Sequence, residues 1–145
     1  MKKHKIILIF SALFIVILCV SLLATCEKVD PINESQVTKI VVWPSGGKEY
    51  ILSADEVAKF INLYNSSYHE GDAPLDYGST PEYGARVYFS DGSLMRLSEW
   101  EGRIKHFEVS VYEADQSQTA WYYISNKKLD DFVAELIEKT KAGTN

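Results

Sequence analysis

The sequence predicts a two-layer α+β domain, in which two helices cover one face of an antiparallel sheet of about five to six strands. Two segments, 54–64 and 129–137, space their apolar residues at i, i+3, i+4 and i+7, which is the pattern of a one-sided helix. Short β-branched or alternating segments separated by turn residues lie between and before them, as in antiparallel strands. The expected element order is β-β-α-β-β-β-β-α.

A hairpin and a helix are expected first. Residues 39–43 are β-branched and aromatic, and 48–52 form a second short strand after a Pro-Ser-Gly-Gly turn. Ser53 and Glu56 have the spacing of a capping box, in which each side chain bonds to the other residue's backbone amide. This signal predicts a helix over residues 54–64.

Residues 65–81 are expected to form a long polar loop, because they hold two glycines and two of the four prolines. Loops of this length are uncommon in compact domains, and many of them are functional. Two acidic residues in it, Asp72 and Asp76, lack the ligand number of a calcium loop, so no metal site is expected.

The remaining chain reads as a meander followed by a helix. Strands are expected over residues 84–90, 94–100, 106–113 and 120–124, and Asp91-Gly92 between the first two is a strong hairpin signal. Ser125 or Asn126 caps the final helix, whose last turn carries two lysines that complement its dipole.

The helices should cover one sheet face and leave the other open to water. Alternation places arginine and aromatic side chains on the open face, and these types are enriched at binding hot spots. The alternative is that the aromatic residues pair across strands and only stiffen the sheet. The predicted contact surface joins this face to the loop tyrosines, and it consists of Tyr68, Tyr77, Tyr83, Arg86, Tyr88, Arg96, Trp100 and Tyr112, with His106, Glu108 and one side of 121–123 on the same face.

The N-terminal segment has the features of a membrane anchor. Lysines lie at positions 2, 3 and 5, and residues 6–26 are uncharged and mostly apolar. At about 1.5 Å per helical residue this stretch reaches roughly 31 Å, enough to cross the hydrocarbon core of a bilayer. The flanking lysines favour the cytoplasmic side, which directs everything after residue 26 outward.

Three interpretations of residues 1–26 remain open. Leu23-Ala24-Thr25-Cys26 resembles a bacterial lipobox, in which the cysteine thiol takes the lipid, although that pattern prefers Gly, Ala or Ser at position 25. The segment is otherwise an uncleaved helix, or an ordinary secretory signal cut after a small-x-small pattern. All three export one domain, residues 39–145, behind a tether predicted over residues 27–38.

Composition excludes several functions for the exported part. The leader holds three of the 15 basic residues and none of the 20 acidic ones, so the exported charge is −8 (12 − 20). This balance opposes binding to nucleic acid and to anionic lipid. Both cysteines, Cys19 and Cys26, belong to the leader, so the domain has neither a disulfide framework nor a thiolate zinc site.

No catalytic signature is present in the sequence. It contains no G-x-S-x-G, H-E-x-x-H, P-loop or dinucleotide fingerprint, and no cofactor is therefore expected. The two histidines after the leader, His69 and His106, have no readable nucleophile beside them. We expect a protein that is not an enzyme.

A family resemblance agrees with this interpretation. The leader ending in Cys26, the opening of residues 38–42, the capped helix from Ser53 and the final helix resemble small lipoproteins of Gram-positive bacteria. The resemblance implies an extracytoplasmic domain of this fold class, and it supplies no catalytic or binding residues.

We therefore expect a non-catalytic binding domain, anchored in the cell membrane on its extracytoplasmic side. Its expected partner is another envelope protein or a small ligand. The alternatives are an inhibitor or immunity protein with one tight protein partner, and a hydrolase that acts on cell-wall material.

Overall fold

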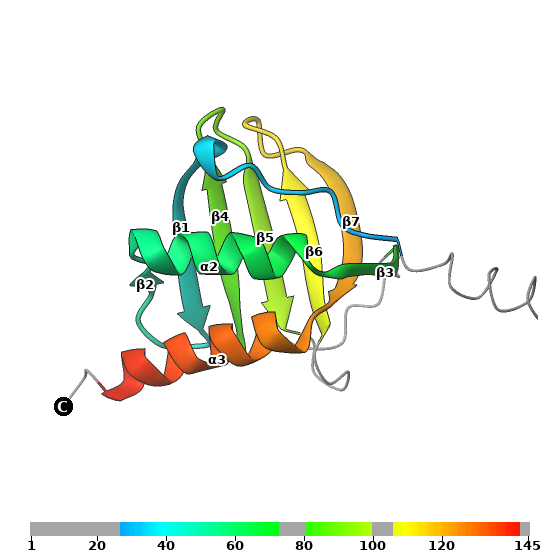
Figure 1. Ribbon diagram of the computed structural model, residues 1–145. Helices are drawn as coiled ribbons and strands as arrows, with labels where there is room; N and C mark the ends of the chain where they lie inside the picture. The colour runs from blue at the N-terminus through cyan, green and yellow to red at the C-terminus, as the bar shows by residue number, and fades with distance from the viewer. Residues whose placement is uncertain (1–26, 73–80, 100–105, 143–145) are drawn as a thin grey trace, which may run out of the picture.

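A computed structural model describes residues 27–72, 81–99 and 106–142, and within them the predicted α+β fold is confirmed (Figure 1). One antiparallel sheet has seven strands in the order β2-β1-β4-β5-β6-β7-β3. The strands are β1 (Val37–Pro44), β2 (Tyr50–Ile51), β3 (Tyr68–Asp72), β4 (Tyr83–Phe89), β5 (Leu94–Glu99), β6 (His106–Tyr112) and β7 (Gln118–Ser125). The helices are α2 (Ala54–Asn65) and α3 (Lys127–Ala142), and a short 3-10 turn, η1 (Glu34–Gln36), precedes β1.

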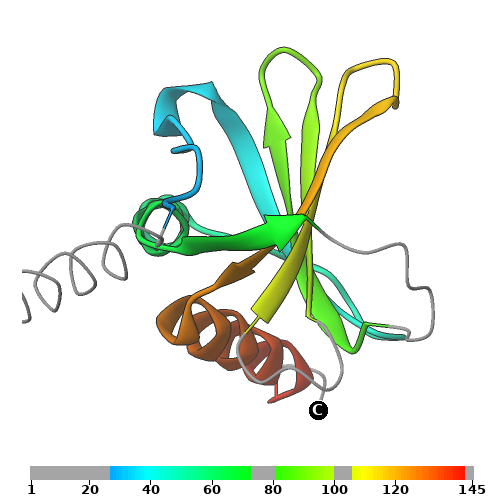
Figure 2. The same cartoon turned by 90° about the vertical axis from the view of Figure 1, so that its right-hand side faces the viewer.

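Both helices lie on one face of the sheet, α2 across its middle and α3 along one end (Figures 1 and 2). The tyrosine hydroxyls of Tyr64 in α2 and Tyr122 in β7 share a hydrogen bond of 2.8 Å, and burial raises the pKa of Tyr64. The apolar core between the layers takes alternate residues from each strand, as the sequence pattern predicted. It includes Ile40, Val42, Ala85, Val87, Leu97, Phe107, Val109 and Ile124 from the sheet and Phe60, Ile61, Leu129, Phe132, Val133, Leu136 and Ile137 from the helices.

Side chains define both helix starts. Ser53 Oγ accepts a hydrogen bond from the Glu56 amide at 3.4 Å, and Glu56 Oε2 accepts one from the Ser53 amide at 2.9 Å. The predicted capping box is therefore present. At α3 the cap is Asn126, whose Oδ1 accepts from the amide of Lys128 at 3.0 Å.

The prediction of a loop over residues 65–81 is wrong at its start, because residues 68–72 form the edge strand β3. The strand pairs with β7 through Tyr68 and Ser125, and its register shifts at a bulge before Gly71, whose φ is 120°. An edge strand forms by backbone pairing on one side and needs no apolar alternation, so a polar sequence gave no strand signal. Residues 73–80 lie outside the described part of the chain.

The prediction of a tether over residues 27–38 is also wrong. Val29 and Ile32 are buried, with 5% and 6% exposure, and both belong to the hydrophobic core. The backbone of Ile32 forms two hydrogen bonds with the side chain of Asn65 at 2.7 and 3.0 Å. Two isolated apolar residues in a polar stretch have no periodicity, so their burial could not be predicted from the sequence pattern.

The helices within the described ranges are all too short or too polar to span a membrane. The leader and its lipidation residue, Cys26, lie outside these ranges, so their three interpretations stay predictions.

Packing of the segment before β1 can be measured by urea unfolding of residues 27–145. Ile32→Ala should lower the free energy of unfolding by about 2–4 kcal/mol, because it removes a buried aliphatic side chain and leaves a cavity. The exposed Gln36 provides the control, and Gln36→Ala should change the free energy of unfolding by less than about 0.5 kcal/mol. Equal, near-zero effects would restore the tether interpretation.

Candidate functional site

The face of the sheet opposite the helices (Figure 2) is here called the open face. By strand register it carries the polar and aromatic residues that alternate with the core. One row across five strands pairs Val41 with Arg86, Arg86 with Arg96, Arg96 with Ser110, and Ser110 with Trp121. The other members of the open face are Lys39, Trp43, Gly84, Tyr88, Leu94, Ser98, His106, Glu108, Tyr112, Tyr123 and Ser125.

On the open face, two arginines flank Trp43. The guanidinium carbons of Arg86 and Arg96 lie 5.6 and 5.1 Å from the indole centroid, within cation–π range, and the indole is only 8% exposed. Gly84, directly opposite Trp43, provides the space. A Cβ at this position would lie 2.6 Å from an indole carbon and 2.2 Å from the Leu97 carbonyl oxygen, so the packing requires glycine.

The two arginines differ in their electrostatic environment. Burial alone would lower the pKa of Arg86, but hydrogen bonds to Glu49, at 2.5 Å, and to Tyr88 raise it above its usual range. Arg96 has no ion pair with any residue in the described ranges. Its Nε and the Trp43 indole nitrogen are buried without a hydrogen bond to those residues. Arg96 is therefore a cation of the open face that forms no ion pair with a described carboxylate.

The predicted contact residues do not all lie together. Arg86, Tyr88, Arg96 and Tyr112 are on the open face, and Tyr68 lies at its β3 edge. Tyr77 and Trp100 are outside the described residues.

The structure removes Tyr83 from the predicted surface. Its side chain is on the helix-covered face, where its ring packs edge-on against Phe107 and its hydroxyl donates to Asp130 Oδ1 at 2.6 Å. Burial and this hydrogen bond raise the pKa of Tyr83, so it is a structural contact between β4 and α3.

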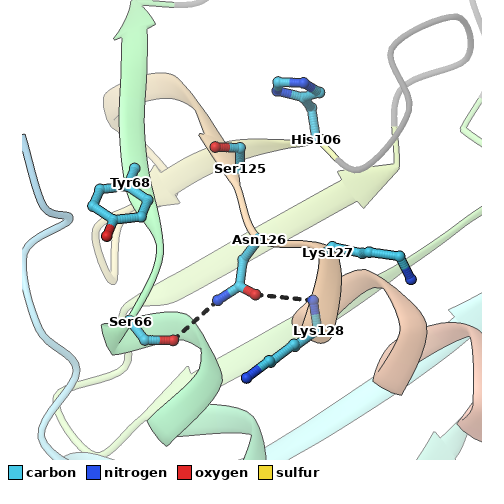
Figure 3. Close-up of a pocket in the computed structure, with 7 residues that line it drawn as sticks. All are labelled: Ser66, Tyr68, His106, Ser125, Asn126, Lys127 and Lys128. Carbon is cyan, nitrogen blue, oxygen red and sulfur yellow. Dashed lines mark hydrogen bonds between the residues drawn. The ribbon is translucent and has the colours of Figure 1, made fainter. Parts of the chain in front are cut away.

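A pocket of about 510 Å³ lies where β3, β6 and β7 meet the start of α3 (Figure 3). We call it the α3 pocket, and its volume is within the range of small-ligand sites. Ser66, Tyr68, His106, Ser125, Asn126, Lys127 and Lys128 line it. Three of these residues belong to one cross-strand row, in which Lys28 pairs with Tyr68, Tyr68 with Ser125, and Ser125 with His106.

The α3 pocket is built around Asn126. Its Oδ1 accepts from the amides of Lys128 and Leu129, and its amide nitrogen donates to the Leu63 carbonyl at 2.6 Å and to Ser66 Oγ at 3.0 Å. This one side chain therefore joins the end of α2 to the start of α3. The first amides of α3 are occupied, so a ligand in the pocket would be bound by side chains rather than by the helix terminus.

The charged groups of the α3 pocket are partly paired. His106 Nδ1 lies 2.6 Å from Glu70 Oε2, without the alignment of a hydrogen bond. Lys127 forms an ion pair with Asp131 in the next turn of α3. Lys128 has no ion pair with a described residue.

Sequence reasoning missed this pocket because its residues come from three separate segments, near residues 66–68, 106 and 125–128. The one available signal was the Asn126 cap, which marks a helix start but not its contact with α2. His69, the other histidine of the domain, is on the helix-covered side of β3, away from the pocket. Its ring is tilted against that of Tyr122, with 5.2 Å between the ring centroids. Within the described part of the chain, no three His, Cys, Asp or Glu residues are grouped to bind a metal.

Comparisons with protein-family models, with curated proteins and with solved structures find no match to this chain. Its function has to be inferred from the two surfaces themselves.

The double role of Asn126 can be separated by two substitutions. Asn126→Ala should lower the free energy of unfolding by about 2 kcal/mol, because it removes the cap and the bridge to α2. Asn126→Asp keeps the cap acceptor and loses the amide donor, so its effect should be intermediate. The measurement is urea unfolding of residues 27–145, with the exposed Lys128→Ala as control. Identical stability of Asn126→Asp and wild type would show that the bridge to α2 contributes nothing.

Proposed function

We propose that this protein is a membrane-anchored, extracytoplasmic, non-catalytic binding domain, which contacts its partner through the open face. The observation that carries the proposal is the cluster of Trp43, Arg86 and Arg96 on a sheet face that neither helix covers. Arginine and tryptophan are the side chains most often found at the energetic centre of an interface.

The charge of this cluster defines the partner's chemistry. Glu49 pairs with Arg86, whereas Arg96 has no carboxylate from the described residues. A guanidinium fork binds a carboxylate with two parallel hydrogen bonds, which gives both energy and direction. The partner is therefore an envelope protein or a small ligand that presents a carboxylate to Arg96.

The anchoring part of the proposal is supported by the leader. Its 21 uncharged residues and flanking lysines predict export, and Cys26 is the residue proposed for lipidation.

Crosslinking on intact cells with a membrane-impermeant reagent tests both parts. The wild-type domain should be labelled and should form one recurring adduct with a partner. Arg96→Ala should reduce that adduct about tenfold or more, because a hydrogen bond to a charged group is worth about 1.5–3 kcal/mol. Lys139→Ala removes the same charge from the exposed surface of α3 and should leave the adduct unchanged.

Thermal midpoints of both variants complete this test. A parallel loss of adduct and of folding in Arg96→Ala would assign this arginine to the structure alone. Absence of any labelling would contradict the extracytoplasmic location.

One group of side chains bears on a second candidate, a hydrolase of cell-wall material. Glu70, His106 and Ser125 follow one another in the order carboxylate, imidazole, hydroxyl that activates a serine nucleophile. However, Ser125 forms no hydrogen bond with His106, and Asn126 occupies the first amides of α3 that would stabilise an oxyanion. The arrangement therefore favours binding over catalysis.

Purified protein should not hydrolyse peptidoglycan. If hydrolysis is measured, a histidine-based mechanism requires that His106→Ala reduce it by about 10²-fold or more. His69→Ala is the matched control and should leave the rate unchanged, because that ring is on the other side of the sheet. Unchanged activity in both variants would eliminate the histidine-based mechanism.

A further inference from the structure

Three side chains of the α3 pocket have hydrogen-bonding groups that the fold does not use. Within the described ranges, the hydroxyls of Tyr68 and Ser125 and Nε2 of His106 form no hydrogen bond. The Asn126 amide and Ser66 Oγ differ, because they bind each other and a carbonyl oxygen of α2. A ligand in the pocket would therefore be bound by the first three side chains.

These three side chains lie in one row. Strand pairing places Tyr68 of β3 opposite Ser125 of β7, and Ser125 opposite His106 of β6. The row spans two strand spacings, about 10 Å in all. Figure 3 shows the three side chains on one side of Asn126, with the lysine side chains of the pocket directed away from them.

The charged groups at the pocket do not select a charged ligand. Lys127 is paired with Asp131, and no described lining residue is acidic, so a cation finds no carboxylate there. The exported domain carries a charge of −8 (12 − 20), which repels an anion. An uncharged ligand therefore suits the pocket best.

An apolar ligand is also unsuited to the pocket. None of the described lining residues is aliphatic, and an apolar molecule would leave the hydroxyls and the imidazole without hydrogen bonds. The one extended apolar surface is the ring of Tyr68, which is 46% exposed. The matching ligand is uncharged, rich in hydrogen-bonding groups, and apolar on one face.

We infer that the α3 pocket binds a neutral sugar ring. The C–H groups on one face of a pyranose are weakly positive, so they can stack on the negative face of the Tyr68 ring. Sugar hydroxyls both donate and accept hydrogen bonds, as the hydroxyl of Ser125 does. The Glu70 carboxylate beside Nδ1 of His106 favours a proton on that atom, which leaves Nε2 to accept a hydrogen bond from a sugar hydroxyl.

This site is separate from the cluster of Trp43, Arg86 and Arg96, here called the Trp43 cluster. Its ligand is uncharged, whereas the proposed partner of Arg96 presents a carboxylate. Sugar binding at the α3 pocket therefore goes beyond the proposed function and does not depend on it.

The test measures sugar binding by the full chain in phosphatidylcholine nanodiscs, which contain no sugar. Saturation-transfer NMR detects ligand protons that touch the protein, and a titration gives the Kd. The probes are methyl β-glucoside, a single ring, and cellotetraose, a chain of the same ring. With one stacking contact and few hydrogen bonds, we expect a Kd of about 0.1–1 mM. Sorbitol has hydroxyls but no ring face, and it should not bind.

Substitutions in the pocket locate the bound sugar. Tyr68→Ala removes the stacking surface and should raise the Kd about tenfold or more. Tyr68→Phe retains the ring and Ser125→Ala removes one hydroxyl, so each should raise the Kd by about 2–10-fold. Both keep the fold in the test if Tyr68→Ala is unstable, which thermal midpoints will show. Ile51→Ala is the control, because this exposed apolar side chain lies on β2 at the opposite edge of the sheet, and its Kd should equal that of wild type.

The two probes also distinguish the source of the sugar. Tighter binding of cellotetraose would assign the pocket to a glycan chain, and equal Kd values would assign it to a free sugar. Absence of transfer to both probes at about 10 mM, ten times the weakest expected Kd, would overturn the inference. Equal binding by wild type, Tyr68→Phe and Ser125→Ala would place the sugar elsewhere and would overturn it too, as would sorbitol binding as tight as that of the glucoside.

Discussion

The fold depends on how the sheet closes the face that the helices leave uncovered. Trp43 is 8% exposed there, held between Arg86 and Arg96, and each cation–π contact contributes about 0.5–2 kcal/mol. The indole fits only because position 84 is glycine. Two cations directly opposite each other on neighbouring strands would normally repel, and Trp43 and Glu49 offset that cost. Among the described residues, side chains of the sheet itself therefore pack over Trp43 on this face.

The sequence pattern correctly predicted the elements whose apolar residues recur with a helical or strand period. The apolar stripes of α2 and α3 and the alternation of β4 and β6 correctly separated the covered face from the open one. Two parts of the domain have no hydrophobic periodicity in their sequence. The strand β3 is held by backbone pairing at an edge, and the segment of residues 27–36 is held by two isolated apolar side chains. Both errors fall on the same corner of the domain, where tertiary contact, not local pattern, decides the structure.

The candidate sites were predictable to different degrees. Arg86 and Arg96 could be assigned to the open face because each alternates with core residues on its own strand. The contact of both with Trp43 depends on the register of β1 against β4, which includes a shift between Val37 and Lys39 that no local signal marks. The α3 pocket was harder to predict from the sequence, because Lys28, Tyr68 and His106 become neighbours only when β3 pairs with β7.

The order of strands also determines how the two surfaces can work together. The Trp43 cluster lies on β1, β4 and β5, and β4 is four strand spacings from β3, about 19 Å across the sheet. An anchored chain would join the domain at the β3 edge, so Arg96 and Trp43 would lie away from the point of attachment. That attachment would limit the orientations of the open face relative to the membrane, because Glu27 and Lys28 already pair with β3 and leave no spacer. An oriented surface loses less rotational freedom when it binds a second envelope component, which is how the anchor would strengthen partner binding without touching the partner.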